Sequence, residues 1–440
     1  MHYWQARNIS YLQILSKLNA RTAALITTLA FSFLALSQLS AQQKVVSVEI
    51  IGLSKTKTAF AKSFVKVRPG VPLDSTQVAS DAQELRNLRL FAEVDYRVLQ
   101  NEDGVAVQFL CKENTTFLPV ANFGSIEDNF WFQLGAVENN WLGRANMLGL
   151  TYRYYDRHSF ETWLKSPYFF SRNWGGSAYL NLFATIEPAY FSDGTTIYNV
   201  DRWTSLLFAR RTYARDYVFE TGGGYLREKY DKNFDRTSVD SPGPTNIEFD
   251  KLLLRTSITV NKVDYFAHYV TGLLNESSFE TIKTFGASDL FWKIENILRY
   301  YYRPYATGNF ALRLRTGLAQ NNDSPFAPFV LDSYLTVRGA GDRVARGTAE
   351  ITLNAEMRQT VFELGWGAMQ AVVFTDWSAW RPGGGELNGL FESENVVSFF
   401  GFGGRLYLKQ FNHLILRADY GFGVTGVKQR GLVIGLGQYF

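Results

Sequence analysis

From residue 117 to residue 440 the sequence is a series of short segments in which apolar and polar residues alternate, and no convincing amphipathic helix interrupts the series. In one segment Leu414 and Leu416 fall on one side, whereas Arg417 and Asp419 fall on the other. Successive side chains of a strand point to opposite faces. A single strand of this kind also fits a sheet with one face in water. A long series without covering helices favours a transmembrane β-barrel with lipid outside and a polar lumen.

The alternating segments number sixteen, which predicts sixteen antiparallel strands over residues 117–440. At about 20 residues for each strand and its connection, every strand has the roughly 9–11 residues that a tilted crossing needs. An even number places both ends of the barrel on the same side. The predicted strands are 118–123, 131–139, 146–156, 159–165, 173–185, 197–211, 217–228, 248–262, 267–278, 290–303, 308–317, 346–360, 366–378, 396–408, 412–422 and 431–440.

The composition agrees with a large β protein and excludes several other classes. The 440 residues include 24 Tyr, 35 Phe, 10 Trp and 36 Gly, an aromatic content typical of membrane barrels but also of soluble β-sandwiches and propellers. A net charge of +4 is too small to indicate the clustered basic surface that nucleic-acid binding needs. One Cys and four His exclude a disulfide framework and a cysteine-based zinc site, so we expect no metal and no cofactor.

The first 41 residues have the order of a secretion signal. Arg7, Lys17 and Arg21 precede the uncharged stretch 22–36, and small and polar residues follow up to Ala41. The alternative is a membrane-anchoring helix, but about 15 apolar residues are fewer than the roughly 20 that span a bilayer. We therefore predict a signal peptide over residues 1–41 and export of the rest of the chain.

Residues 44–114 differ from the rest because helical and strand patterns are mixed in them. Asp74 or Ser75 is placed to cap the second helix at its N-terminus. Cys111 lies in the last strand, where a packed thiol is the expected state. The predicted order is β-α-α-β-β: a strand at 44–52, helices at 56–65 and 76–88, and strands at 91–98 and 105–111.

This segment resembles a POTRA domain, the periplasmic module of the BamA/TamA superfamily of outer-membrane assembly proteins. The matching stretches are I-I-G-L at 50–53, G-V-P-L-D at 70–74 and L-R-L-F-A-E-V at 88–94. Only one such module fits before the barrel begins, whereas assembly factors of the family carry several in tandem. The resemblance implies a small α+β domain in the periplasm.

The barrel region resembles the bacterial surface antigen barrel of the same superfamily. Val337-Arg338-Gly339 resembles the V-R-G-F/Y tip of a loop that folds back into the barrel, with Ala340 in place of the usual aromatic residue. Further matching stretches are E-N-N-W-L-G at 138–143, R-G at 346–347, N-A-E-M-R at 354–358, V-F-T-D-W at 373–377 and L-R-A-D-Y-G at 416–421.

The resemblance implies that Arg338 pairs with Asp376 on the inner wall, next to Phe374, and fixes the loop as a plug. The planar fork of a guanidinium group matches a carboxylate, and a buried arginine without such a partner is costly. Glu356 and Arg358 share one strand face, so both are expected to face the lumen and support this pair. The alternative is that these are separate lumen charges solvated by trapped water.

The final segment, 431–440, alternates and ends on an aromatic residue, which resembles the outer-membrane β-signal. Leu432, Ile434, Leu436 and Phe440 share one face, with Phe440 expected at the bilayer interface. In the family, a weak seam between the first and last strands accepts client strands by β-augmentation. The resemblance therefore implies a seam between the strands near 118–123 and 432–440.

The function implied by this resemblance is insertion of outer-membrane proteins, or translocation of a protein substrate, in a Gram-negative outer membrane. The implied partners are the lipid bilayer, unfolded protein clients, and periplasmic or lipoprotein accessory subunits. The alternative is a passive channel or a structural subunit with a plugged barrel. The sequence has no set of nucleophile and base residues of the kind that an outer-membrane lipase or protease needs, so no enzymatic activity is expected.

Overall fold

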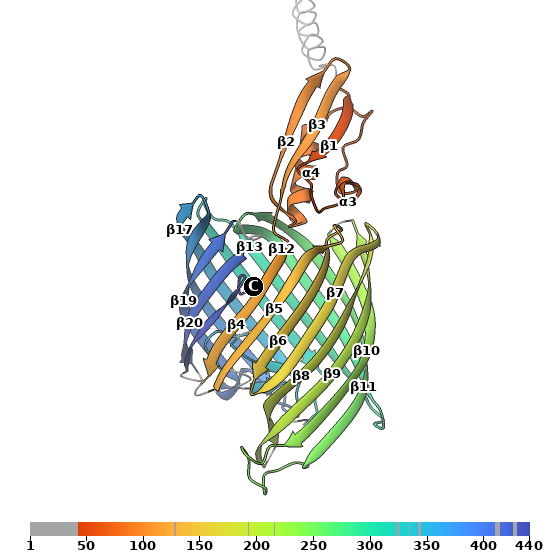
Figure 1. The fold of residues 1–440 in the computed structure, drawn as a ribbon. Helices are drawn as coiled ribbons and strands as arrows, with labels where there is room; N and C mark the ends of the chain where they lie inside the picture. Colours follow the sequence, from red (N-terminus) through yellow and green to blue (C-terminus); the bar gives the residue numbers. More distant parts are fainter. Residues whose placement is uncertain are drawn as a thin grey trace, which may run out of the picture.

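The computed structural model describes residues 43–126, 129–191, 193–214, 216–322, 324, 326–333, 335–341, 345–409, 414–425 and 429–440. A small N-terminal α+β unit stands on one rim of a large β-barrel (Figure 1). We call the rim that faces this unit the proximal rim and the opposite one the distal rim. The predicted signal peptide, residues 1–41, lies outside the described residues.

The described residues of the barrel form sixteen antiparallel strands in one closed sheet, as predicted, and each predicted segment overlaps one of them. Each strand pairs with its neighbours in the chain, and β21 returns to β4 to close the ring. The strands are β4 Phe117–Ile126, β5 Asn129–Trp141, β6 Asn146–Tyr155, β7 Arg157–Ser171, β8 Trp174–Phe191, β9 Gly194–Tyr213, β10 Tyr217–Lys232, β11 Asn246–Phe266, β12 Tyr269–Thr284, β13 Leu290–Tyr302, β14 Gly308–Ala319, β17 Ala349–Leu364, β18 Gly367–Arg381, β19 Val396–Leu408, β20 Leu414–Thr425 and β21 Arg430–Leu436.

The alternation in sequence becomes an apolar outer face and a polar inner face. On β18, Met369 and Val373 are exposed on the outside, while Gln370, Phe374 and Asp376 are buried inside. Exposed aromatic side chains also gather near the turns of the proximal rim. They are Phe117, Trp141, Phe169, Trp174, Tyr213, Tyr217, Phe266, Tyr302, Phe362 and Trp366.

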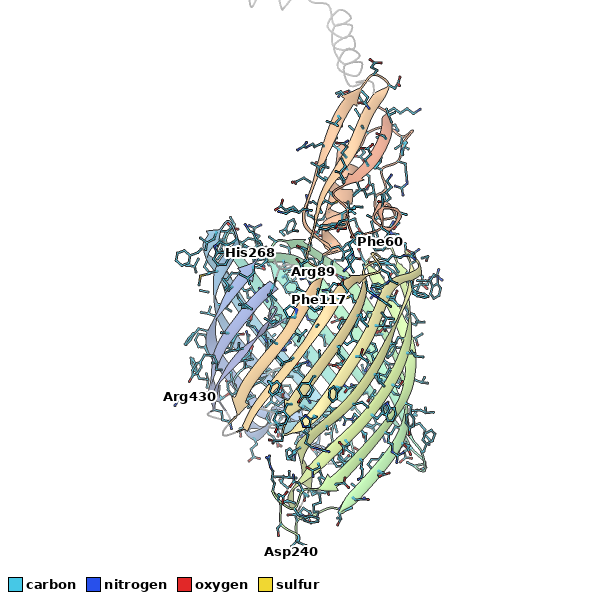
Figure 2. The ribbon with its side chains drawn as sticks, in the orientation of Figure 1. Phe60, Arg89, Phe117, Asp240, His268 and Arg430 are labelled. Atoms are coloured by element: carbon cyan, nitrogen blue, oxygen red, sulfur yellow. The ribbon has the colours of Figure 1, made fainter. Side chains whose placement is uncertain are left out.

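Four neighbouring strands, β8 to β11, extend past the others at the distal end, where Asp240 marks the outermost loop (Figure 2). These strands are longer than predicted. Their backbone hydrogen bonds continue at the distal end, beyond the part of the barrel that has an apolar outer face. The inner face of this extension has a core of its own around Tyr198, Val200 and Tyr230. The loop between β10, which continues to Lys232, and β11, which begins at Asn246, covers residues 233–245.

No helix among the described residues has the length and apolar content needed to cross a membrane. The two α-helices of the described residues belong to the N-terminal unit. This unit consists of β1 Val45–Ile51, α3 Thr58–Lys62, α4 Ser75–Asn87, β2 Phe91–Asn101 and β3 Gly104–Glu113. This is the predicted β-α-α-β-β order. The strands form a sheet in the order β1-β3-β2, in which β1 runs parallel to β3.

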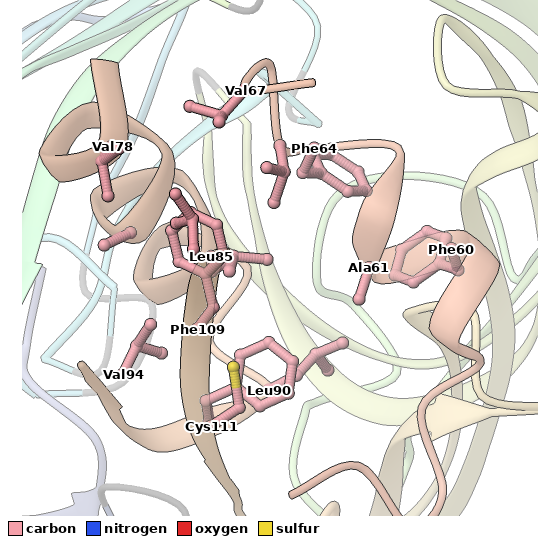
Figure 3. Close-up of a cluster of buried hydrophobic side chains, with 14 of the residues drawn as sticks. Phe60, Ala61, Phe64, Val67, Val78, Leu85, Leu90, Val94, Phe109 and Cys111 are labelled. Atoms are coloured by element: carbon pink, nitrogen blue, oxygen red, sulfur yellow. The ribbon is translucent and has the colours of Figure 1, made fainter. Parts of the chain in front are cut away.

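The core of the N-terminal unit lies between the two helices and one face of the sheet (Figure 3). Leu85 of α4 and Phe109 of β3 are fully buried there. Asp74 caps α4 by accepting hydrogen bonds from the backbone N–H groups of Thr76 and Gln77. Cys111 packs in the same core, where burial, with a smaller contribution from the charge of Glu113, raises the pKa of its thiol to about 12.

The N-terminal unit docks onto turns of the proximal rim on two sides of the barrel mouth (Figure 2). On one side, the ring of Tyr168 packs against the rings of Phe60 and Phe64, with centroids 5.5 and 5.1 Å away. On the other side, Arg89 lies over the ring of Tyr265 at 4.8 Å. Aromatic and cation–π contacts thus fix the unit against the barrel from both sides.

A carboxylate orders the loop through which the unit meets the barrel. Glu113 accepts hydrogen bonds from the backbone N–H groups of Lys55, at 2.8 Å, and Thr56, at 2.7 Å. The hydroxyl of Thr56 in turn accepts a hydrogen bond from Asn140 near the end of β5. Burial acts to raise the pKa of Glu113, but hydrogen bonds from the Ser54 and Thr56 side chains and from the loop backbone outweigh it and lower this pKa to about 2.

We predict that Glu113→Gln lowers the thermal stability of the protein at neutral pH, because the loop loses its charged acceptor. The folded pKa lies below the ordinary value of about 4.3, so the carboxylate stabilises the folded state above pH 4.3. This stabilisation disappears as the pH falls from about 4 to about 2. Thermal unfolding of both proteins from pH 7 to pH 2 measures the effect, and the two curves should converge at the acidic end.

The matched control is Glu93→Gln. Glu93 forms an exposed ion pair with Lys112 at 3.6 Å, a type of contact that contributes little to stability. An equal loss of stability in both variants would contradict the assigned role of Glu113.

Candidate functional site in the barrel lumen

The connection from β14 to β17 folds into the lumen and carries the predicted loop tip. A short hairpin, β15 Phe329–Leu331 paired with β16 Ala345–Gly347, forms the base of the loop and was not predicted. Backbone N–H groups of Thr336 and Val337 both donate to the carbonyl oxygen of Asp332, which closes a tight turn. Gly339 has a φ of +92°, a conformation that favours glycine at the tip.

Arg338 is fully buried inside the barrel, against the wall, and makes a bidentate contact with Asp376 of β18. Its Nε atom donates to Oδ2 and its Nη2 atom to Oδ1, both at 2.9 Å. The backbone N–H of Arg338 donates to the same Oδ2 atom at 2.9 Å. Nη1 donates to Glu356 of β17 at 2.6 Å. Charge-assisted pairs of this geometry fix both the position and the orientation of the tip.

Two aromatic rings enclose the guanidinium group of Arg338. Its Cζ atom lies 3.6 Å from the ring centre of Phe374 and 4.3 Å from that of Tyr439. Ala340, at the position where the family has an aromatic residue, is buried beside Val337. The cation–π contacts therefore come from the wall and from the end of the chain, because the tip itself provides no ring.

The network extends beyond the predicted residues. Arg358 donates to Glu356 at 2.6 Å, as their shared strand face suggested. Arg405 of β19 donates to both carboxylate oxygens of Asp419 on β20, at 2.7 and 3.2 Å. Asp419 also lies 3.7 Å from Arg338. The cluster thus joins four wall strands, β17 to β20, through ion pairs.

The sequence reasoning did not assign roles to Arg405, Asp419, Asn354 or Tyr439. Asp419 lies in the L-R-A-D-Y-G stretch at 416–421, and its alternation with Leu416 already indicated a lumen-facing side chain. Asn354 donates to Asp376 at 2.8 Å from the matched stretch 354–358. A search of the matched strands for inward polar residues would have found both. No local pattern indicated Tyr439.

The predicted outer face of the last strand is present in part. Leu432 is exposed on the outside of β21, and Ile434 and Leu436 lie on the same face, half-buried. The expectation that Phe440 shares this face is wrong. The strand ends at Leu436, Gly437 turns the chain with a φ of +86°, and Phe440 packs inside the barrel.

The seam between β21 and β4 is the weakest junction of the barrel. Among the described residues its register contains one paired position, Ile434 with Phe123. By contrast, β4 pairs with β5 at ten positions and β20 with β21 at seven. Gly431 and Gly435 of β21 contribute no side chains to pairing in this strand.

The loop tip presses against the strands beside this seam. A Cβ atom added to Gly421 of β20 would lie 2.3 Å from the carbonyl oxygen of Arg338. A Cβ atom added to Gly431 of β21 would lie 3.3 Å from Cα of Gly339. The paired glycines Gly421 and Gly431 therefore provide the close approach that the tip requires.

On the other side of the loop, the wall of β8 to β13 encloses a cavity of about 610 Å³. Arg202, Glu228 and Lys251 line it and are joined by ion pairs. Arg346, near the base of the loop, pairs with Glu187 on the same wall. The loop thus has ionic contacts on both sides, and the lumen is divided between the buried cluster and this cavity. No group of three His, Cys, Asp or Glu with metal-binding geometry occurs among the residues that the structure describes.

Together these features define a sixteen-stranded barrel with an N-terminal α+β unit, a weak seam, and a loop fixed in the lumen by a buried arginine. Comparison of the sequence with protein-family models gave no match, and neither did comparison with curated proteins. Solved structures do match. This chain is similar to BamA from Haemophilus ducreyi lacking POTRA domains 1–3, with a TM-score of 0.53 and 13% identity over 89% of this chain and 84% of that one.

The chain is also similar to CdiB from two organisms. For CdiB from Acinetobacter baumannii the TM-score is 0.56, with 14% identity over 90% of this chain and 73% of that one. For CdiB from Escherichia coli the TM-score is 0.59, with 11% identity over 90% of this chain and 76% of that one. The chain therefore has the fold of the BamA and CdiB barrels, as the sequence resemblance implied.

We predict that Arg338→Ala destabilises the barrel by about 3–5 kcal/mol, because Asp376 and Glu356 become buried charges without their partner. Unfolding of the detergent-solubilised protein in urea measures this change. The matched control is Arg227→Ala, which removes an exposed arginine paired with Glu248 and should leave the stability nearly unchanged. Equal stability of the Arg338 variant and the wild type would contradict the role of Arg338 as the anchor of the loop.

We also predict that Gly421→Ala displaces the loop tip, because the new methyl group would clash with the carbonyl oxygen of Arg338. The expected cost is about 1–3 kcal/mol, as for other overpacked interiors. Gly404→Ala on the neighbouring strand is the control, since a Cβ atom there meets no heavy atom within 4 Å. Urea unfolding of the two variants should separate them; indistinguishable curves would rule out close contact at Gly421.

Proposed function

We propose that this chain is an outer-membrane barrel that assists the insertion of other outer-membrane proteins by pairing with their strands at the β4–β21 seam. The observation that carries this proposal is the single paired position between these strands. Backbone groups that are not paired across the seam are available to a client strand, which can add to the edge by β-augmentation. The process is non-covalent, so no catalytic residue is proposed.

The occupied lumen favours insertion at the seam over passage of a chain through the barrel. Arg338 and its partners occupy part of the lumen, and removing the loop would leave several buried charges unpaired. Translocation through the lumen requires this loop to leave, whereas strand pairing at the seam leaves it in place. Insertion is therefore the less costly of the two family activities for this barrel.

The N-terminal unit suits the role of a periplasmic module that receives clients. It resembles a POTRA domain, and β2 is an edge strand of its three-stranded sheet. Tyr96, Val98 and Leu99 on this strand are exposed. An exposed edge with apolar side chains is suited to pairing with an extended peptide. Docking on the proximal rim would hold that edge near the barrel mouth, and we infer that the proximal rim faces the periplasm.

We predict that a disulfide across the seam abolishes the activity. The double variant Phe123→Cys with Ile434→Cys links the one paired position, while Leu353→Cys with Trp377→Cys links β17 to β18 in the closed part of the wall and serves as control. Each variant is reconstituted in liposomes, and folding of an added unfolded barrel protein is followed. The oxidised seam variant should lose the stimulation and regain it on reduction, and the control should keep it throughout.

The same seam variant, as the only copy in cells, distinguishes the remaining alternatives. A joint fall of many outer-membrane proteins supports insertion. If one secreted protein disappears instead, the insertion proposal is wrong and the protein exports a dedicated substrate. If the levels of all these proteins are normal and liposomes that contain the protein leak ions, the insertion proposal is wrong and the protein is a passive channel.

A further inference from the structure

The outer face of the barrel carries polar side chains in the middle of its apolar surface, on strands β10 to β13. On β13 the outward side chain halfway along the strand is Asn296, next to the exposed Ile294. On β12 the corresponding places hold Asn275 and Ser277, next to the exposed Phe279. We call the set Thr221, Thr256, Asn275, Ser277 and Asn296 the polar patch.

The register of the sheet makes the polar patch continuous across four strands. Ser277 of β12 is the cross-strand partner of Asn296 on β13. Thr221 of β10 is the partner of Thr256 on β11, and their hydroxyl groups are 3.0 Å apart. The outward neighbours of Thr256 along β11 are the exposed Leu254 and Ile258. Apolar side chains thus flank the polar patch toward both rims, which places it at the depth of the hydrocarbon.

The two amide groups are only partly satisfied within one barrel. Nδ2 of Asn296 donates to Oδ1 of Asn275 at 2.9 Å and to Oγ of Ser277 at 2.8 Å. Among the described residues, Oδ1 of Asn296 accepts no hydrogen bond, and Nδ2 of Asn275 has only a 3.5 Å contact with Ser277. An amide has two donor hydrogens and an acceptor oxygen. No water completes these bonds in hydrocarbon, so a polar partner at the same depth would stabilise both groups.

The wall on the other side of the lumen loop shows what the lipid-facing surface otherwise looks like. Its outward mid-strand side chains include Leu353 of β17, Val373 of β18 and Phe402 of β19, all exposed. Thr375 of β18 is polar, but its hydroxyl donates to the backbone carbonyl oxygen of Phe399 at 3.2 Å, within the sheet. Apolar side chains are the rule on this surface, and the polar patch departs from it.

The polar patch lies opposite the seam. The ring contains eight strands from β4 to β11 and eight from β12 to β21, so the junction of β11 with β12 is as far from the seam as the barrel allows. Figure 1 shows β4 in front and the paler β12 and β13 in the far wall. A partner bound at the polar patch therefore leaves the seam facing lipid and the lumen loop in place.

A second copy of this chain meets the requirements of the polar patch. Two copies related by a two-fold axis along the membrane normal present each side chain at the same depth, so that polar groups meet polar groups. An amide can pair with an identical amide because it both donates and accepts. The polar patch is uncharged, so its approach to a second copy brings no like charges together.

We propose that the polar patch is the contact through which two copies of this chain pair side by side in the membrane, with hydrogen bonds between the amides of Asn275 and Asn296 of facing copies. The pairing goes beyond the proposed function and does not depend on it, because neither the seam nor a client takes part. Both seams of such a pair remain open to the bilayer.

The test uses the full chain in liposomes that contain no other protein. Asp240→Cys, in the outermost distal loop, is labelled with donor or acceptor dye, and the native Cys111 is buried in the N-terminal unit. Energy transfer should rise with the ratio of protein to lipid and fall when excess unlabelled protein is added. With Asn275→Leu and Asn296→Leu together, half-maximal transfer should need an about tenfold higher ratio.

The matched control is Thr375→Val, which removes an outward hydroxyl from the other wall and should leave the transfer curve unchanged. Urea unfolding of the double leucine variant should keep the wild-type midpoint, because leucine is favoured at lipid-facing positions. A lower midpoint with unchanged transfer would assign the amides to the pairing of β12 with β13 inside one barrel and overturn the proposal. Transfer that unlabelled protein does not reduce would also overturn it.

A cross-linking measurement keeps both amides and does not depend on the leucine variant. Ser277→Cys places a thiol in the polar patch, and Val373→Cys places one at mid-strand on the other wall. A short bis-maleimide added to the liposomes should give a covalent dimer of the Ser277 variant on a denaturing gel and leave the Val373 variant monomeric. Monomer alone for the Ser277 variant, or equal dimer yields for both variants, would contradict pairing at the polar patch.

Discussion

The structure of the lumen depends on the burial of one guanidinium group. Arg338 lies inside the barrel with none of its surface exposed, and Asp376 and Glu356 compensate its charge at hydrogen-bond distance. A buried cation is tolerated only when such partners are present. Because they come from different strands, the loop position and the relative positions of the wall strands are fixed together.

The strands next to the seam satisfy a different requirement. Gly421 and Gly431 let the loop tip approach the backbone, and Gly437 lets the chain turn inward. The absence of side chains that permits these contacts also weakens pairing in β21. The buried ion pairs of the loop tip and the junction with the fewest paired positions therefore lie side by side, which is the arrangement that the proposed function requires.

Much of the fold was predictable because its signals are local. Alternation with a period of two gave sixteen strands, and Asp74 marked the start of α4. The ends of β8 to β11 were missed because strands that extend past the apolar band need no apolar outer face. In the site, Arg338 and Asp376 were predicted together through resemblance, and strand parity placed Glu356 and Arg358 in the lumen. Arg405 and Tyr439 were not found, since their partners are far away in the sequence and no spacing rule connects them.

The sequence by itself determined which faces of the strands are polar and apolar, because side-chain direction follows from the strand backbone alone. It also determined the number of strands and the residue types suited to a buried ion pair. Only the tertiary structure decided the direction of the last three residues. In an extended strand Phe440 would share the outer face of Leu436, but one left-handed glycine at position 437 sends it into the lumen. The arginine side chains of the lumen come from strands that are far apart in the sequence. They come together only when the barrel closes, so no single segment of the sequence could have indicated the cluster.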